Sequence, residues 1–137
     1  MFSALPGGRA GAALFLLRVF VGIAFVFHGY GKVVNIPAFA AEFNLPSPLA
    51  VMAAYVQLLA GVLMIAGFLT PLASVCLAAT MAVATVKLIR RGEPFVDPHG
   101  HSWEASSFYL IAVLAIALLG PGSFSVDALL FARVGAP

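Results

Sequence analysis

The residues best suited to chemistry are cationic side chains inside one apolar stretch, Leu14 to Lys32. Arg18 lies in the interior of this stretch, and His28 and Lys32 lie near its end. Ionisable groups are costly in hydrocarbon and are tolerated where they face protein, water or a partner. At 100° per residue, Arg18 and Lys32 share one stripe of a helix, with His28 beside it. We therefore expect a polar helix face that turns into a bundle, where it either packs or binds a ligand.

The composition places these groups in a membrane protein. Of the 137 residues, 63% are hydrophobic and only 9% are charged, and the mean hydropathy is +1.10. Soluble domains are about 45–50% apolar and about 25% charged. The length suits one domain over residues 1–137. No basic run with interleaved aromatic residues occurs, so nucleic-acid binding is rejected. The single cysteine, Cys76, excludes a disulfide within the chain.

The elements that must position these groups are apolar segments of spanning length. We predict four spans, over residues of about 12–34, 49–69, 71–89 and 103–119. The last is at the short limit for crossing a bilayer. A short amphipathic helix, capped by Ser125, is expected at the C-terminal surface. The fold class is therefore an all-α membrane protein, an antiparallel four-transmembrane-helix bundle with a short C-terminal interfacial helix.

The alternation of the spans places several polar groups at one depth in the membrane. His28 and Lys32 end the first span, Lys87 ends the third, and Trp103 and Glu104 begin the fourth. All would lie on the side opposite to the two termini. We expect His28, Lys32 and Glu104 to converge in one pocket that takes a polar head group. The alternative is that these residues only anchor the helices at the membrane interface, with aromatic rings at headgroup level and lysines that extend to the water. The excess of Lys and Arg on this side favours extracytoplasmic termini.

Three further polar residues need partners inside or beside the bundle. Gln57 lies near the middle of the second span. A buried amide at this depth either forms a hydrogen bond between helices or binds a ligand. Arg18 finds no acidic residue in the interiors of the spans, and Asp127 is its candidate counter-charge. We predict that this pair fastens the C-terminal helix to the first span. In the rival arrangement, Asp127 stabilises only its own helix and Arg18 bonds Gln57 and backbone carbonyls.

The markedly polar loop over residues 90–102 contains a weak pattern of possible metal ligands. His99 and His101, with Asp97 nearby, are the candidate ligands, but loops often hold such residues without a metal. No intrinsic metal or haem is expected. There is no haem-attachment motif, phosphate-binding glycine loop or nucleophile elbow. The sequence contains no complete catalytic set, so whether the chain is an enzyme stays open.

Four stretches in order resemble the DoxX family of small four-helix bacterial membrane proteins, over nearly the whole chain. They are LLRVFVGIAFVFHGYGK in the first span, QLLAGVLMIAGFLT through the second, WE at the start of the fourth, and LLGPGSFSVDALL after it. Arg18, His28, Lys32 and Glu104 match polar positions of the family. Many members have a glutamate where this chain has Gln57, so a proton-transfer role at that position is in doubt.

The resemblance implies a multi-pass protein of the bacterial inner (cytoplasmic) membrane. The family is similar to quinone-associated or redox-associated subunits, including the membrane subunit of thiosulfate:quinone oxidoreductase. The expected function is a membrane subunit that binds a quinone-like partner within the bundle and works with other membrane or soluble redox proteins. The alternative is a non-catalytic accessory subunit of a larger membrane enzyme complex. A partner or bound cofactor must supply the redox centre. The candidate ligand-binding residues are Arg18, His28, Lys32, Gln57, Trp103 and Glu104.

Overall fold

The computed structural model of the chain describes residues 6–99 and 102–134, and within them it is helical without strands. The helices are α1 (Gly8–Val34), α2 (Ile36–Glu42), α3 (Ser47–Ala66), α4 (Thr70–Arg90), α5 (Glu104–Leu119) and α6 (Val126–Val134). Helices α1, α3 and α4 are long and apolar enough to cross a membrane, and α5 is a shorter apolar helix. The prediction of an all-helical membrane bundle is confirmed.

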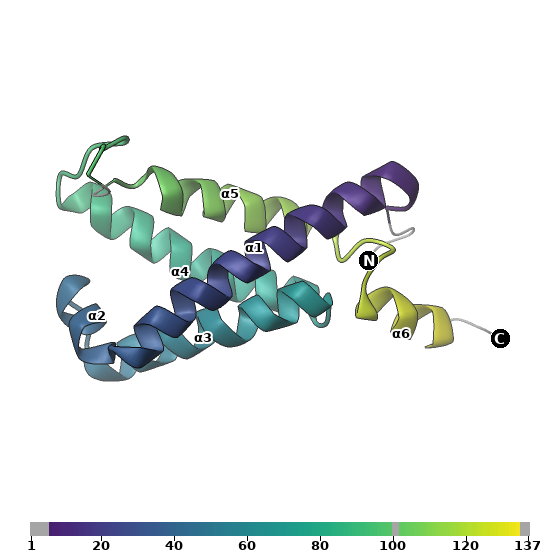
Figure 1. The fold of residues 1–137 in the computed structure, drawn as a ribbon, viewed down its shortest axis with the longest axis horizontal. Helices are drawn as coiled ribbons and strands as arrows, with labels where there is room; N and C mark the ends of the chain where they lie inside the picture. The colour runs from purple at the N-terminus through teal and green to yellow at the C-terminus, as the bar shows by residue number, and fades with distance from the viewer. Residues whose placement is uncertain (1–5, 100–101, 135–137) are drawn as a thin grey trace.

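The four long helices form two closely packed pairs. Helix α1 packs along α3, α4 packs along α5, and α3 and α4 are joined as a hairpin. Figure 1 shows α1 running obliquely across the bundle, so that it crosses α5 near one end and lies against α3 at the other. The start of α1 and the whole of α6 lie at the same end of the bundle, which we call the termini end. The opposite end, which we call the loop end, carries α2 and residues 91–99, which follow α4.

Local sequence signals explain where the helices begin and end. Helix α3 begins after Pro46, which is extended, and has a second proline in its first turn. It ends at Gly67, whose φ of +67° is a left-handed conformation that glycine adopts without strain. Asn35 separates α1 from α2, and its side chain accepts a bond from the Ala38 N–H at 3.4 Å. The α3–α4 turn is therefore tight, and α2 folds back directly from the end of α1.

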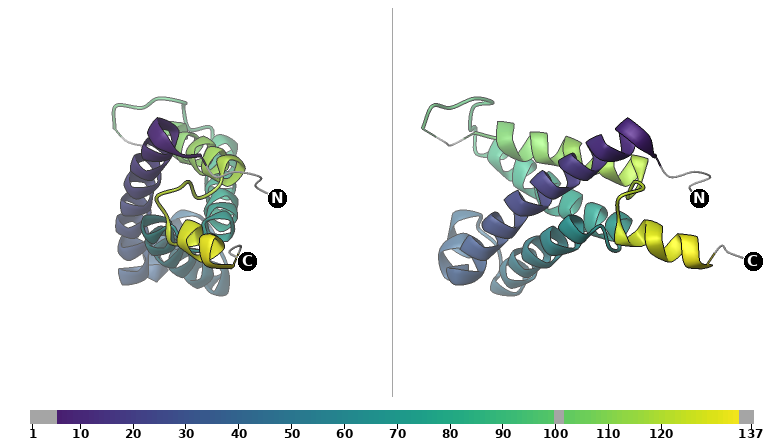
Figure 2. Two further views of the ribbon diagram at one scale, coloured as in Figure 1. Left: turned by 90° about the vertical axis from the view of Figure 1, so that its right-hand side faces the viewer. Right: turned by 45° about the vertical axis from the view of Figure 1, so that its right-hand side comes forward.

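The core and the outer surface have the distribution expected of a membrane bundle. The core draws on all four long helices, with side chains such as Phe25 of α1, Met64 of α3, Leu77 of α4 and Ile116 of α5. Large apolar side chains also face outwards, among them Phe27 at 74% and Leu118 at 81% exposure. So much exposed apolar surface is unusual for a water-soluble protein and suits contact with lipid. The left view of Figure 2, from the termini end, shows α1, α3, α4 and α5 arranged around a common axis.

Glycines allow the backbones of α1 and α3 to approach each other closely. A Cβ added at Gly29 would lie only 2.4 Å from the Leu58 nitrogen. Gly22 of α1 likewise faces Gly61 of α3, whose carbonyl oxygen would lie 2.8 Å from an added Cβ. Small residues at such positions let helix backbones pack closely in membranes. Position 29 therefore fixes the last turns of α1 against α3, beside the residues that form the candidate site.

Gly29→Ala tests this close approach. We expect the substitution to lower the Tm of the purified protein in detergent, because overpacking a tight contact costs about 1–3 kcal/mol. Gly31→Ala is the matched control, since a Cβ at Gly31 meets no atom within 4 Å. An alanine there should leave the Tm unchanged or raise it, because alanine is the better helix former. Equal Tm values for the two variants would contradict the packing described here.

Candidate functional site

A cavity of about 370 Å³ lies towards the loop end, between α2, α3, α4 and the last turn of α1. A volume of this size falls within the range of known small-ligand sites, about 300–1,000 Å³. Its wall is almost entirely apolar. The lining residues are Lys32, Phe39, Phe43, Leu45, Leu49, Met52, Ala53, Val56, Gln57, Cys76, Ala79, Thr80, Val83 and Ala84.

Lys32 and Gln57 form the polar part of this cavity. The Lys32 Nζ donates a hydrogen bond to the Gln57 Oε1 at 2.6 Å. The same Nζ lies 4.7 Å from the centroid of the Phe39 ring, which is close enough for a cation–π interaction. Gln57 is only 2% exposed. The long stem of Lys32 thus carries a cation inwards from the end of α1 to a buried amide and an aromatic face.

Helix α2 forms one wall of the cavity and is fastened to α4. It directs Phe39 and Phe43 towards the cavity, and their rings lie 5.4 Å apart. The Lys87 Nζ donates to the Phe43 carbonyl at 2.7 Å and to the Asn44 carbonyl at 3.2 Å. Carbonyls at a helix C-terminus carry partial negative charge, so a lysine there stabilises the end of α2. Lys87 therefore supports the wall of the site and does not bond Glu104.

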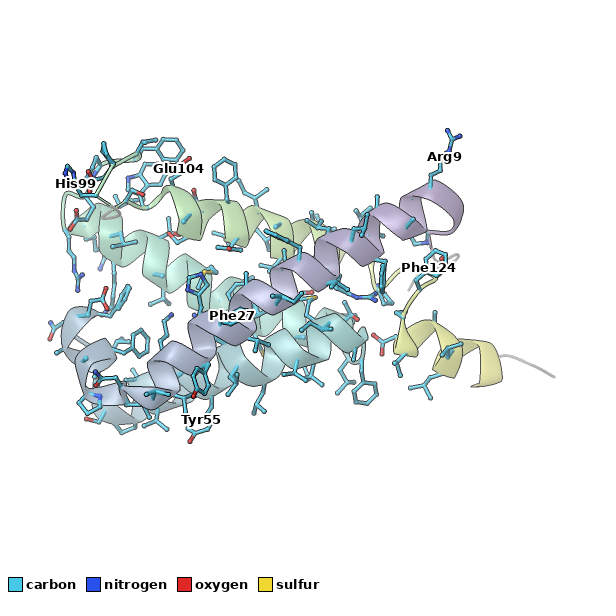
Figure 3. The ribbon with its side chains drawn as sticks, viewed as in Figure 1. Arg9, Phe27, Tyr55, His99, Glu104 and Phe124 are labelled. Atoms are coloured by element: carbon cyan, nitrogen blue, oxygen red, sulfur yellow. The ribbon has the colours of Figure 1, made fainter. Side chains whose placement is uncertain are left out.

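The structure does not bring Glu104 and His28 into the cavity that Lys32 lines. Glu104 begins α5 and lines a separate hollow between α1 and α5, together with Tyr109. His28 is exposed, and its ring meets that of Tyr109 edge-on at 5.8 Å. Figure 3 shows Glu104 at the start of α5, close to the loop that carries His99. The separation arises because α1 diverges from α5 towards the loop end, so groups at one depth lie apart laterally.

Two residues of the polar loop region lie outside the cavity. The Trp103 ring packs against that of Phe95, with their centroids 4.5 Å apart. The His99 Nδ1 lies 3.4 Å from the Asp97 Oδ1, whereas His101 lies outside the described residues. Over residues 6–99 and 102–134, no three His, Cys, Asp or Glu side chains are grouped so that they could hold a metal ion.

Arg18 holds the C-terminal segment against the bundle at the termini end. Its side chain is 1% exposed, and its guanidinium donates to the carbonyls of Pro121 and Phe124, the second at 2.5 Å. Gly67 makes room for it, because a Cβ there would lie 2.6 Å from the Arg18 Cζ. Figure 3 shows Phe124 between the start of α1 and α6. Backbone carbonyl dipoles thus compensate a charge buried inside a spanning helix.

Asp127 caps a helix other than its own. Its carboxylate accepts from the Leu69 N–H at 2.8 Å and from the Thr70 N–H at 2.9 Å, at the start of α4. Its own N–H donates to the Gly67 carbonyl at 2.9 Å. A carboxylate at a helix N-terminus satisfies N–H groups that have no partner within the helix. The two residues Arg18 and Asp127 therefore fasten the segment 120–127 to α1 and to the α3–α4 turn, respectively.

The predicted Arg18–Asp127 ion pair is not formed: within the described part of the chain, no nitrogen of Arg18 lies within 4 Å of a carboxylate oxygen of Asp127. The rival arrangement is also only partly right. Arg18 does bond backbone carbonyls, but Gln57 bonds Lys32 instead. The α6 helix has its own cap, because the Ser125 Oγ accepts from the Ala128 N–H at 3.0 Å, as predicted. The capping of α4 by Asp127 has no signal in the local sequence, because 57 residues separate Asp127 from Thr70.

Asp127→Asn tests the cap of α4. The asparagine keeps one acceptor oxygen, so one of the two N–H groups at residues 69 and 70 loses its partner. A hydrogen bond to a charged group contributes about 1.5–3 kcal/mol, and we expect a clear fall in Tm in detergent. Glu93→Gln is the control, because the Glu93 side chain makes no hydrogen bond or ion pair within the described residues. A fall in Tm as small as that of the control would contradict the capping role.

Comparisons with known proteins agree with this architecture. The sequence model of the DoxX family matches residues 13–89. A Bacillus subtilis (strain 168) protein named "Putative oxidoreductase CatD" is 33% identical over 121 residues, which cover 85% of each chain. No solved structure matches the chain significantly. The matched region contains the cavity-lining residues of α1 to α4, including Lys32 and Gln57. The chain therefore belongs to the DoxX family and is a membrane protein.

Proposed function

We propose that this protein is a membrane subunit of a redox complex and that it binds a quinone-like, lipid-soluble partner in the cavity between α2, α3 and α4. The observation that carries the proposal is the Lys32–Gln57 pair inside an otherwise apolar cavity. A ligand site of this kind combines apolar walls with a few polar groups that fix orientation. The ring carbonyl of a quinone would bond the polar pair, and its tail would follow the apolar wall.

The oxidoreductase name of the Bacillus subtilis relative supports a redox setting. Quinone supplies the electron-accepting chemistry when it is bound, and the chain's own residues bind and orient it. The Gln57 amide is neither an acid nor a base near physiological pH, so it would serve as a hydrogen-bonding group and not as a proton donor in the reaction. The electron donor in this proposal is a soluble oxidoreductase that associates with the membrane subunit in the bacterial inner membrane.

The alternative proposal is an accessory role within a larger membrane enzyme complex. Helix α6 favours it, because this helix extends away from the termini end of the bundle and exposes Leu129 and Leu130. Native mass spectrometry of the gently solubilised complex separates the two roles. Retained quinone supports the first proposal, whereas a stoichiometric partner subunit without quinone supports the second.

Cys76 gives a direct test of the quinone proposal, since this single cysteine lines the cavity and is partly buried. We expect decylubiquinone to slow the reaction of Cys76 with a small maleimide in lipid nanodiscs. The ring of this quinone is fully substituted, so it does not itself add to thiols. In Lys32→Met, the concentration needed for protection should rise about tenfold, because a charge-assisted hydrogen bond is lost.

The matched control is Glu104→Gln, which removes a carboxylate outside the cavity. Protection of Cys76 should be as strong in this variant as in the unmodified protein. If decylubiquinone gives no protection of the unmodified protein at any soluble concentration, the quinone proposal fails. If both variants lose protection equally, the ligand does not bind at the Lys32–Gln57 pair.

A further inference from the structure

At the polar end of the cavity, the N–H groups of Lys32 and Gln57 that have no protein acceptor are donors, and we infer that the site selects the form of a ligand that accepts hydrogen bonds. For a quinone, this means that the oxidised form binds more tightly than the neutral quinol. The inference rests on the proposed quinone site and specifies which redox form that site takes up. It follows from the donors and acceptors of the lining residues, considered one by one.

Lys32 brings donors only. An ammonium group has three N–H donors and no acceptor. One donor bonds the Gln57 Oε1 at 2.6 Å, and Lys32 makes no other hydrogen bond within the described residues. The Phe39 ring stabilises the charge from one side but provides no lone pair. Lys32 therefore keeps N–H groups for an acceptor in the cavity.

Gln57 also presents donors to the cavity. Because Lys32 can only donate, the amide must turn its oxygen towards Lys32 and its Nε2 away from it. The Nε2 makes no hydrogen bond within the part of the chain that the structure describes, although the residue is only 2% exposed. Among the described residues, the fully buried side-chain atoms without a hydrogen-bond partner do not include this Nε2, so a molecule in the cavity can still reach it. A ligand carbonyl placed between Lys32 and Gln57 would satisfy both.

Acceptors are scarce among the lining residues. The described lining contains no aspartate or glutamate. The Thr80 hydroxyl donates to the Leu77 carbonyl at 2.9 Å, so only its lone pairs remain. The Cys76 sulfur is a weak acceptor. A quinol oxygen can accept from Lys32, but each quinol hydroxyl also carries a proton that needs an acceptor. A quinone carbonyl carries no such proton, and the cation of Lys32 favours the electron-rich carbonyl oxygen.

Preferential binding of the oxidised form indicates in which direction the quinone reacts. A subunit that takes up quinone and releases neutral quinol suits a complex in which quinone is reduced. The soluble partner would then be the source of electrons, and a reaction that consumes quinol would follow elsewhere in the membrane.

Anaerobic calorimetric titrations with decylubiquinone and decylubiquinol test the inference in quinone-free nanodiscs. We expect the unmodified protein to bind the quinone at least about tenfold more tightly than the quinol. Lys32→Met should weaken quinone binding and bring the two affinities within about threefold of each other, whereas Lys32→Arg should preserve the preference. Glu104→Gln is the matched control and should leave the binding of both forms unchanged, because Glu104 lies outside the cavity.

The outcomes separate this inference from the proposed function. Equal affinities for the two forms, or tighter binding of the quinol, would overturn the inference and leave a quinone site in place. Binding of neither form would overturn the proposed function itself. A preference that survives unchanged in Lys32→Met would show that other groups select the redox form, and would also overturn the inference.

Discussion

A cation inside a membrane-spanning helix must find partners within the protein, and α1 carries two such cations. Arg18 meets this requirement at the termini end through the carbonyls of Pro121 and Phe124. Lys32 meets it near the loop end through the Gln57 oxygen and the face of Phe39. Arg18 binds the segment between α5 and α6, and Lys32 binds α3, so each cation joins α1 to another part of the chain at one end of the bundle.

The partners of the charged side chains differ between the two ends of the bundle. At the termini end, the guanidinium of Arg18 and the carboxylate of Asp127 are both bonded to backbone groups, which fixes the C-terminal segment. At the loop end, Lys32 has one protein acceptor and lies in the wall of a cavity. The first arrangement stabilises the fold, whereas the second leaves donors for a ligand. One helix thus connects a structural anchor to a candidate binding site.

The fold could be predicted from the sequence, because hydropathy alone locates the four apolar helices, although the predicted second span ran to residue 69 and α3 ends at Ala66. The candidate site could be predicted only in part. Depth in the membrane follows from position along a helix, but lateral distance depends on crossing angles that the sequence does not reveal. Glu104 and Lys32 lie towards the same end and yet line different hollows. The partner of Asp127 was missed for a related reason, since any helix N-terminus at that end offers the same N–H groups.

Photoaffinity labelling with an azido-quinone would show whether a quinone binds in the cavity beside Lys32 and Gln57. The purified protein in nanodiscs would be illuminated with the probe, digested and mapped by mass spectrometry, with excess decylubiquinone as competitor. We expect competed labelling of cavity-lining positions on α3 and α4, over residues 49–57 and 76–84. Competed labelling confined to the hollow of Glu104 and Tyr109, or labelling that no competitor reduces, would contradict this expectation.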